Sequence, residues 1–406
     1  MLLLVFNAGS SSLKFELLEV SGNSRARRIS GGAFIDAADG SGQFVPRTTP
    51  AMPAALSGVA TLAAAAGSVL AWLADASIHG SDRTREIAAT VHRIVHGGER
   101  FRATTVLGDP ELAALAGISE LAPLHNPPAL AVIGAVRKAL GPAMPVIGVF
   151  DTAYYAELPE AAYQYALPPR WRTEFGIRRY GFHGTAHRSL CQGARELLGP
   201  ATVPSRIVSL QLGRGCSVTA THGTQAMATS MGFTPLEGLV MGTRSGDVDP
   251  GALLHVMERT GMSPSDMSRE LNNASGLLGL SGRTAEMSDL LSLERAGERS
   301  AALAVEVFCR RARHYLAAYI AELGGVDAIV FGGGIGENCP DVRRRIIGDL
   351  GWAGIEMSPE ANDASIAVAA NIATPSSRAA ILVIPVDEAS VIAGEAAALL
   401  RRQQPV

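Results

Sequence analysis

Short apolar runs separated by glycine-rich and serine-rich turns form the main pattern of this chain. Leu2 to Phe6 and Leu13 to Val20 have the length and composition of strands, and they are joined by a small polar turn over residues 7–12. Arg206 to Leu212 and Cys216 to Thr221 flank a glycine turn in the same way in the second half of the chain. A hairpin of this kind in each half predicts a duplicated domain.

The remaining pattern alternates aliphatic strands with alanine-rich and leucine-rich helical stretches, which is typical of α/β layers. The expected strands span residues 87–95, 146–150, 328–331 and 380–384. A domain boundary is expected near residue 150, and a C-terminal helix over residues 389–402 is expected to pack back on the first half. The sequence thus predicts an N-terminal domain of residues 1–151 plus 386–406, and a second domain of residues 152–385.

Composition and charge argue against several classes of protein. With 406 residues the chain has room for two domains, and its net charge of −3 argues against a broad nucleic-acid-binding face. Residues 51–74 carry no charge, but proline, glycine and serine dilute their hydrophobicity, so they predict an alanine-rich packed helix and no membrane span. The N-terminal apolar run is too short for a signal peptide. The four cysteines are too scattered for a zinc site or a redox motif, which favours reduced thiols in the cytoplasm.

Three turns have the chemistry to hold phosphate. The first, Asn7 to Lys14, combines exposed backbone N–H groups, hydroxyls and one ammonium, although a plain serine-rich turn has the same composition. The second spans Gln211 to Ser217, and the third, Phe331 to Asn338, continues from a strand toward a helix. The third turn lacks the last glycine and the downstream acidic residue of a dinucleotide fingerprint, which argues against a Rossmann oxidoreductase.

Short polar clusters follow several of the expected strands. A lone histidine is more often a satisfied core or surface residue than a catalyst, and surface ion pairing would explain an isolated arginine or carboxylate. Several such clusters in one chain instead indicate a site. They lie at His92–Glu99, Leu124–Pro128, Phe150–Thr152, Tyr180–His187, Met241–Pro250 and Pro385–Glu388.

Taken in order, these segments resemble the acetate and propionate kinase family, which has the actin, hexokinase and sugar kinase superfamily fold. Residues 7–15, Asn-Ala-Gly-Ser-Ser-Ser-Leu-Lys-Phe, are similar to the family's first signature. Residues 179–187, Arg-Tyr-Gly-Phe-His-Gly-Thr-Ala-His, are similar to its second, and residues 230–250 match a further segment almost position for position. The resemblance covers nearly the whole chain and implies duplicated actin-like ATPase (ribonuclease H-like) domains with a catalytic cleft between them.

The resemblance implies catalytic roles for Arg93, Asp151, His183 and Arg244. The two arginines would flank the transferring phosphoryl group, because guanidinium forks neutralise charge on its oxygens. His183 would hydrogen-bond the same group, and Asp151 would help to organise the carboxylate and the arginines.

Binding residues are implied in the same way. Asn7 and Glu388 would lie at a site for Mg²⁺ or Mn²⁺, which bridges the phosphates of ATP or ADP. The acetate substrate would contact Val95, Leu124, His125, Phe182 and Pro235. The nucleotide and its phosphates would contact Ser10, Ser12, Lys14, Gln211, Gly213, Arg214, Gly215, Glu286, Gly332, Gly333, Gly334, Ile335, Gly336 and Asn338.

The implied reaction is reversible transfer of the ATP γ-phosphoryl group to acetate by in-line displacement, which gives acetyl phosphate and ADP. A carboxylate is already ionised near pH 7, so no general base is needed, and positioning and electrostatics carry the reaction. Val95 favours acetate, because propionate-preferring relatives tend to have a smaller residue there; propionate or another short acid is the alternative. The resemblance also implies a homodimer, with residues 152–385 as the domain that binds the nucleotide and forms the dimer contact.

Two stretches depart from the family pattern. Gln211 and Arg214 stand where the family's second phosphate loop has histidine and asparagine, and Arg214 adds a full positive charge. Residues 286–288, Glu-Met-Ser, replace an Asp-Phe-Arg triplet near the ribose and adenine, a loss that Arg283 could offset. A different phosphoryl donor, such as pyrophosphate, is therefore an alternative to ATP. A noncatalytic nucleotide-binding relative is another, although a scaffold has no need for the retained convergent set of catalytic residues.

Overall fold

The structure is a computed structural model that describes residues 1–9, 12–22, 26–35, 43–46, 61–200 and 203–403. The chain forms two compact units, one of Met1–Ala156 with Asp387–Val406 and the other of Glu157–Val386. We call them unit 1 and unit 2. The assignment of separate functions to two domains stays a prediction.

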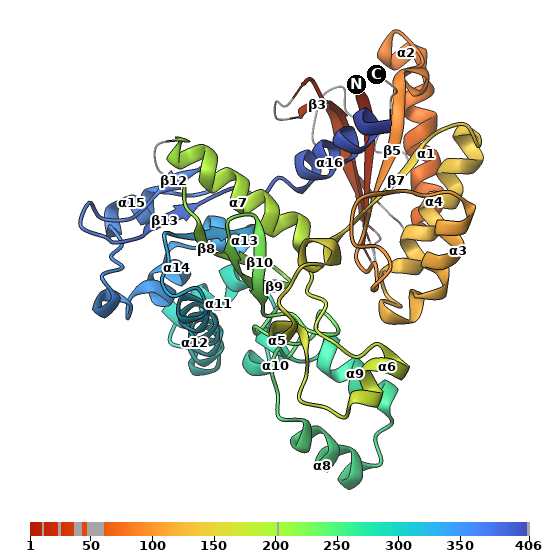
Figure 1. The fold of residues 1–406 in the computed structure, drawn as a ribbon. Helices are drawn as coiled ribbons and strands as arrows, with labels where there is room; N and C mark the ends of the chain where they lie inside the picture. The colour runs from red at the N-terminus through yellow and green to blue at the C-terminus, as the bar shows by residue number, and fades with distance from the viewer. Residues whose placement is uncertain (10–11, 23–25, 36–42, 47–60, 201–202, 404–406) are drawn as a thin grey trace. The chain divides into compact units, whose positions relative to one another are not determined.

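Unit 1 is built on a sheet with the strand order β4-β3-β2-β1-β5-β7-β6 (Figure 1). Strands β1 and β2 pair antiparallel, which confirms the first hairpin, whereas β1, β5 and β7 run parallel. The strands are β1 Leu2–Ala8, β2 Ser12–Glu19, β3 Arg27–Ile35, β4 Gln43–Pro46, β5 Ile87–Ile94, β6 Thr105–Val106 and β7 Val146–Phe150.

Helices cover both faces of this sheet. Leu4 and Phe6 of β1 pack against α1 and α4, whereas the alternate residues Leu3 and Val5 pack against α16. Helix α16 confirms the expected C-terminal helix and its packing on the first half. Helix α1 confirms the later part of the alanine-rich helix, and residues 51–60 lie outside the described residues. The α-helices of unit 1 are α1 Leu62–Ala74, α2 Ala76–His79, α3 Asp109–Gly117, α4 Asn126–Leu140 and α16 Glu388–Gln403.

Unit 2 repeats this plan with a sheet of order β10-β9-β8-β11-β13-β12 (Figure 1). Strands β8 and β9 form the expected second hairpin, and β8, β11 and β13 run parallel. In both sheets an antiparallel hairpin continues into parallel strands and ends on a short antiparallel strand. The strands are β8 Arg206–Leu212, β9 Cys216–His222, β10 Gln225–Thr229, β11 Ala328–Gly332, β12 Ala370–Asn371 and β13 Ala380–Val383.

The helices of unit 2 include one that replaces an expected turn. The third glycine turn is itself helical: α13 begins directly after β11, and only then does the expected helix α14 follow. On one face of the sheet, Leu190 and Ala194 of α7 pack against Ile207 and Val330. The α-helices are α5 Glu160–Tyr163, α6 Pro169–Phe175, α7 Gly184–Leu198, α8 Pro250–Thr260, α9 Pro264–Asn273, α10 Gly276–Ser281, α11 Met287–Arg295, α12 Arg299–Glu322, α13 Gly333–Asn338, α14 Pro340–Ile347 and α15 Pro359–Ala364. In the described part of the chain, no helix is both long and apolar enough to cross a membrane.

Candidate active site

In unit 1, the carboxyl ends of parallel strands bring the predicted polar residues together. Asn7 pairs opposite Arg93 across β1 and β5, and β7 ends directly before Asp151. Arg93 donates from Nε to Oδ1 of Asp151 at 2.9 Å and from Nη2 to the second carboxylate oxygen. Its Nη1 donates to Oδ1 of Asn7 at 3.0 Å, and Oε1 of Glu388 lies 3.6 Å from Nε. The predicted metal-binding and catalytic residues of unit 1 therefore meet around one guanidinium.

Arg93 and Asp151 form a buried, bidentate ion pair. Their side chains are 14% and 1% exposed. Burial alone would lower the pKa of Arg93, but the charges of Asp151 and Glu388 outweigh it and raise that pKa above its ordinary value. Arg93 is therefore a permanent cation with a fixed orientation.

Asn126 holds the loop that carries Val95. Its side chain accepts a hydrogen bond from the backbone N–H of His96 at 3.3 Å and donates one to the carbonyl oxygen of His96 at 2.9 Å. Val95 itself is buried, whereas Leu124 is 56% exposed and His125 is half-buried. The amide of Asn126 thus joins the Val95 loop to the start of α4, directly after Leu124 and His125.

The first hairpin places two of its three predicted phosphate-binding residues. Ser12 begins β2, and its carbonyl oxygen accepts a hydrogen bond from the N–H of Gly9 at 2.7 Å. Lys14 is exposed and pairs opposite Asn7 in the hairpin. Ser10 lies outside the described residues.

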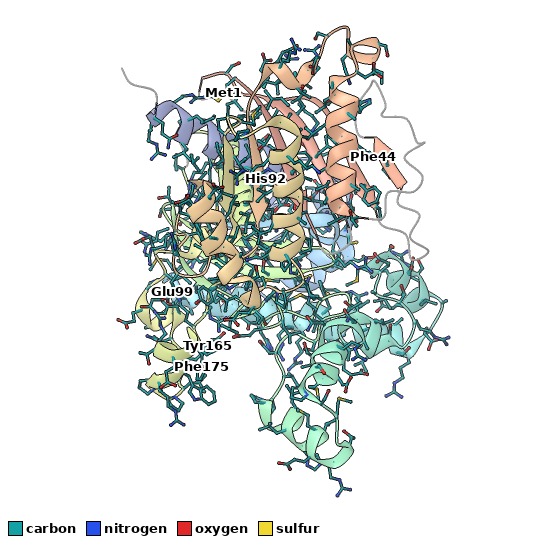
Figure 2. The ribbon with its side chains drawn as sticks, turned by 90° about the vertical axis from the view of Figure 1, so that its right-hand side faces the viewer. Met1, Phe44, His92, Glu99, Tyr165 and Phe175 are labelled. Carbon is teal, nitrogen blue, oxygen red and sulfur yellow. The ribbon has the colours of Figure 1, made fainter. Side chains whose placement is uncertain are left out.

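One histidine of the polar clusters belongs to the core. His92, labelled in Figure 2, is buried on β5 and stacks on Phe6 with ring centroids 5.4 Å apart. Burial lowers the pKa of His92 to about 3, so its ring stays neutral. The structure therefore assigns His92 to packing, the role that a lone histidine most often has.

In unit 2, Arg244 and His183 converge on the tip of the glycine hairpin. A Cβ atom at Gly215 would lie 3.3 Å from Nη2 of Arg244 and 3.3 Å from Nε2 of His183, so glycine keeps the space in front of both groups open. Arg244 donates from Nη1 to the carbonyl oxygen of Pro235 at 2.8 Å. Burial lowers the pKa of Arg244, and among the described residues no carboxylate forms an ion pair with it.

His183 occupies a strained position at the start of α7. Its φ of 58° lies in the left-handed region, which residues other than glycine rarely adopt. Nδ1 of His183 lies 2.9 Å from Oγ of Ser217 on β9. The neighbouring Phe182, predicted for the substrate pocket, is buried.

The second and third glycine turns meet at the ends of β8 and β11. Gln211 and Gly332 pair across these strands. Gly333 has a φ of +75°, and a Cβ there would lie 2.8 Å from Nε2 of Gln211, so the close approach requires glycine. A Cβ at Gly213 would lie 3.9 Å from the backbone nitrogen of Gly334. The second and third glycine turns, both predicted to contact the nucleotide, are therefore neighbours in unit 2.

The remaining predicted nucleotide residues lie near these loops or on the surface. Ile335, Gly336 and Asn338 belong to α13, where Asn338 donates to the carbonyl oxygen of Gly334 at 2.9 Å. Glu286 is exposed and precedes α11.

The departures from the family pattern differ in their surroundings. Oε1 of Gln211 is buried and has no hydrogen-bond partner among the described residues. Arg214 is exposed, and its carbonyl oxygen accepts a hydrogen bond from Gly242 N–H at 3.0 Å. Arg283 pairs with Glu298 at 3.4 Å on the surface. Arg283 is thus engaged with a carboxylate of its own unit.

Two residues that the sequence did not single out support α13. Glu337 accepts hydrogen bonds at Oε1 from the N–H groups of Gly333, at 2.9 Å, and of Val386, at 3.1 Å. Arg343 is fully buried and donates to the carbonyl oxygen of Gly336 at 2.7 Å. Arg343 lies in a run of three arginines on α14, so no local signal distinguishes it from its two half-buried neighbours.

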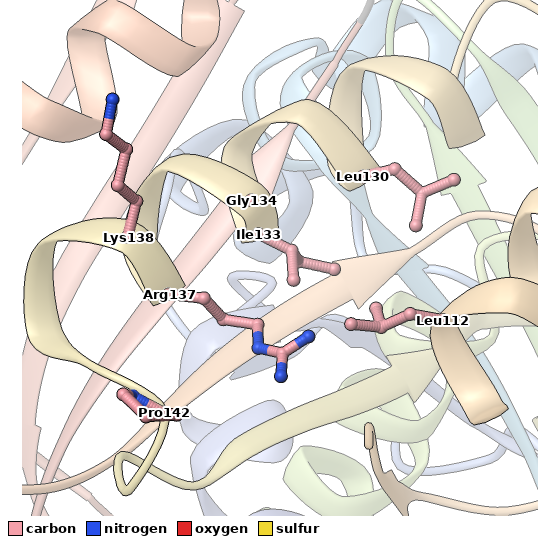
Figure 3. A pocket seen from close by; sticks show the side chains of 7 residues that line it. All are labelled: Leu112, Leu130, Ile133, Gly134, Arg137, Lys138 and Pro142. Atoms are coloured by element: carbon pink, nitrogen blue, oxygen red, sulfur yellow. The ribbon is translucent and has the colours of Figure 1, made fainter. Parts of the chain in front are cut away.

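A surface hollow on unit 1 is separate from these groups. Figure 3 shows its apolar lining from α3 and α4 and the cationic side chains at its rim. Arg137 at this rim pairs with Asp109 at 2.8 Å. The described residues that line the hollow include none of those predicted for the site: Leu112, Leu130, Ile133, Gly134, Arg137, Lys138 and Pro142.

The repeated sheets, with cationic side chains and glycine loops at the ends of their parallel strands, define a phosphotransferase of the duplicated actin-like ATPase class. A sequence profile of the Acetokinase family matches residues 2–394. The chain belongs to this family.

Individual relatives agree with the profile. An acetate kinase of Solibacter usitatus is 43% identical, with 96% of each chain covered. The crystal structure of Porphyromonas gingivalis acetate kinase superposes with a TM-score of 0.86 at 35% identity, covering 98% of this chain and 99% of that one. A propionate kinase from Francisella tularensis superposes with a TM-score of 0.87 at 33% identity, covering 97% and 98%. These matches confirm the predicted family, the fold class and a carboxylate-accepting phosphotransferase.

Proposed function

We propose that this protein transfers the γ-phosphoryl group of ATP to acetate, reversibly, to form acetyl phosphate and ADP. The observation that carries the proposal is the half-buried guanidinium of Arg244. It lies beside Nε2 of His183 at a glycine hairpin, and no carboxylate of the described residues pairs with it. A desolvated cation without a protein counter-ion favours a bound anion, and a phosphoryl group supplies one.

The reaction requires one bond to form and one to break. An oxygen of the acetate carboxylate attacks the γ-phosphorus, the bond from that phosphorus to the bridging oxygen breaks, and ADP leaves with the electron pair. Arg93 and Arg244 stabilise the charge on the equatorial oxygens, because both guanidinium groups are oriented before the substrate binds. Asp151 holds Arg93 in this orientation, and His183 donates a hydrogen bond to the phosphoryl group.

The residues of unit 1 fit a divalent ion that is held mainly by its substrate. Oδ1 of Asn7 and the carboxylate of Glu388 both lie beside Arg93 and are the kind of oxygen ligands that Mg²⁺ prefers. Mg²⁺ usually takes one or two protein oxygens and fills its shell with phosphates and water. When bound, it would neutralise part of the polyphosphate charge.

The test is acetyl phosphate formation, trapped as the hydroxamate, with acetate, ATP and Mg²⁺. We expect Arg244→Met to lower kcat by about 10³-fold, in the range found when a donor to transition-state charge is removed. The matched control is Arg269→Met, which removes an exposed arginine of the same unit and should leave kcat within twofold. A wild-type protein that forms no acyl phosphate with any donor would refute the proposal.

Acetate is the proposed acceptor rather than a longer acid. Val95 is buried, and its loop is anchored by Asn126, so the pocket wall at this position has little freedom to move. One methylene in such a pocket changes kcat/KM by about 10–200-fold. We expect Val95→Ala to raise kcat/KM for propionate relative to acetate, and an unchanged ratio would place the specificity elsewhere.

The phosphoryl donor is tested through Arg214. Its carbon stem lies against Gly242, where a Cβ would lie 3.4 Å from Cγ of Arg214. The exposed guanidinium therefore extends from the phosphate loop and adds charge near a polyphosphate. We propose ATP as the donor and expect Arg214→Asn to raise KM for ATP. Equal rates with ATP and pyrophosphate in the wild type would instead favour the alternative donor.

We also propose that the enzyme is cytoplasmic and forms a homodimer. Within the described chain, no residue of helix α8 is buried. Its Leu254 and Val256 side chains are 61% and 41% exposed. On α6, Phe175 is 62% exposed (Figure 2). A second copy of the chain would cover such apolar groups. Light scattering should give twice the chain mass, and Leu254→Lys should shift it toward the monomer.

A further inference from the structure

A chain of hydrogen bonds runs from His183 into the interior of unit 2. Oγ of Ser217 lies 2.9 Å from Nδ1 of His183 and 2.7 Å from Nε2 of His187. Nδ1 of His187 lies 2.7 Å from Oγ of Ser209, whose hydroxyl lies 3.5 Å from the carbonyl oxygen of Thr219. The last four residues are fully buried. We call these five residues the histidine relay.

The relay is assembled by one helix face against one sheet face. His183 directly precedes α7 and His187 lies in its first turn, and the rings of both contact Oγ of Ser217. Ser217 and Thr219 alternate on β9 and therefore point to the same face of the sheet. Ser209 on β8 pairs directly opposite Thr219. The spacing of the polar groups therefore follows from regular secondary structure.

The far end of the relay sets the direction of its hydrogen bonds. A carbonyl oxygen can only accept, so the hydroxyl of Ser209 donates to Thr219 and accepts from Nδ1–H of His187. Burial lowers the pKa of His187 well below its ordinary value, so His187 is neutral and its Nε2 is unprotonated. Ser217 must then donate to His187 and accept from Nδ1–H of His183.

Arg244 favours the same arrangement from the other side of His183. Nη2 of Arg244 and Nε2 of His183 both lie 3.3 Å from the Cβ position of Gly215. A guanidinium beside Nε2 favours a lone pair at that nitrogen over an N–H. The carbonyl oxygen of Thr219 at one end of the relay and Arg244 at the other end therefore both favour a proton on Nδ1 of His183.

We propose that Ser209 and His187 are positioning residues that keep the proton of neutral His183 on Nδ1, so that His183 can donate from Nε2 to a phosphoryl oxygen only as an imidazolium. The inference rests on the proposed function, in which His183 contacts that group. Binding of the phosphoryl anion is then coupled to uptake of one proton at Nε2, and this hydrogen bond is lost as the imidazolium deprotonates.

Few other groups around His183 change charge near neutral pH. On β9, burial raises the pKa of the Cys216 thiol to about 12, so it stays protonated. On α7, His187 stays neutral. From the loop after β10, Arg244 remains cationic, because even a lowered arginine pKa lies far above 7. The pH dependence in this range therefore reports mainly on His183 among these groups.

The proton position can be measured without any activity. Long-range ¹H–¹⁵N correlation spectra of protein labelled in its nine histidines distinguish a protonated Nδ1 from a protonated Nε2, and His183→Gln assigns the signal. We expect neutral His183 to carry its proton on Nδ1. Ser209→Ala removes the acceptor for His187 Nδ1–H, so the relay should reverse and move the His183 proton to Nε2. Ser217→Ala, which removes the link itself, should also release the proton to Nε2.

The functional consequence is a change in the pH profile. In the wild type, kcat/KM for ATP should fall up to tenfold per pH unit once His183 deprotonates. In Ser209→Ala, neutral His183 can donate from Nε2. The fall in kcat/KM per pH unit should therefore be at least threefold smaller than in the wild type, and the maximum kcat/KM should be lower. Thr229→Val is the matched control, because it removes a buried hydroxyl that contacts Oγ1 of Thr219 but lies outside the relay.

Each outcome decides the proposal. A neutral wild-type His183 with its proton on Nε2, or a proton that stays on Nδ1 in both serine variants, would overturn it. A pH profile that changes equally in Thr229→Val would also overturn it, because the effect would then be one of packing. If the enzyme formed no acyl phosphate at all, the spectra would still report the proton position. A failure of the proposed function can therefore be distinguished from a failure of this inference.

Discussion

The ion pair between Arg93 and Asp151 makes a quantitative test possible, because we expect both the stability of unit 1 and the proposed activity to depend on it. Arg93→Met keeps most of the volume of the side chain but leaves the carboxylate of Asp151, which is 1% exposed, without its charged partner. Breaking a buried pair in this way costs about 3–5 kcal/mol. For a domain of 150–250 residues, each kcal/mol lowers Tm by about 2–4 °C, so unit 1 should melt about 6–20 °C lower.

The assay must report on unit 1 alone, because two units need not unfold together. Trp72 is buried in unit 1, whereas Trp171 and Trp352 are 40% and 83% exposed in unit 2. Replacing the two exposed tryptophans by phenylalanine makes the fluorescence of Trp72 a local probe of thermal unfolding. Acetyl phosphate formation is measured on the same samples and should fall by at least 10³-fold in Arg93→Met.

A double variant separates the charge from the packing. Arg93→Met with Asp151→Leu removes both charges, so no buried ion is left unpaired, and most of the lost stability should return while activity stays low. If Arg93→Met cost less than about 1 kcal/mol, or if the double variant were no more stable than the single one, the ion pair would not have the energetic role described above.

Three other variants extend these expectations. Gly215→Ala should lower kcat/KM about 10–100-fold with a change in Tm of less than about 2 °C, because the new Cβ meets only the ends of side chains in the site; a large loss of stability would contradict this. Arg343→Met should destabilise unit 2 to urea by about 3–5 kcal/mol, since it leaves carbonyl oxygens such as that of Gly336 without donors, and Arg343→Lys should recover little. Although burial tends to raise the pKa of Asp327, hydrogen bonds from Arg206 lower it to about 2. The folded-state pKa is below the unfolded one, so the stabilisation of about 1–2 kcal/mol that Asp327→Asn removes is present above about pH 4 and is lost toward pH 2; a difference from the wild type that is independent of pH would contradict it.

Local patterns were sufficient for the elements of the fold. The hairpins, the parallel strands and helix α16 were predicted because apolar periodicity and turn chemistry act between near neighbours in the chain. The same patterns did not show that Gly333–Asn338 is helical, since glycine has a low helix propensity and the turn is held by a distant side chain, Arg343. Some strands, such as β3, were also not singled out, because they are held by pairing with the strands on either side and have no clear alternation of their own.

For the site, the sequence identifies the chemical groups but does not show which groups contact one another. The signature residues could be named from the sequence, because the segments that contain them resemble those of the acetate and propionate kinase family, and their residue types suit phosphoryl transfer. Strand register brings Asn7, Arg93 and Asp151 to one sheet edge, although they are far apart along the chain. The packing of unit 2 also leaves Arg244 without a carboxylate partner among the described residues and orients His183 through Ser217. These contacts depend on which strands are neighbours and on how deeply each group is buried, and both are properties of the packed sheets rather than of any local segment.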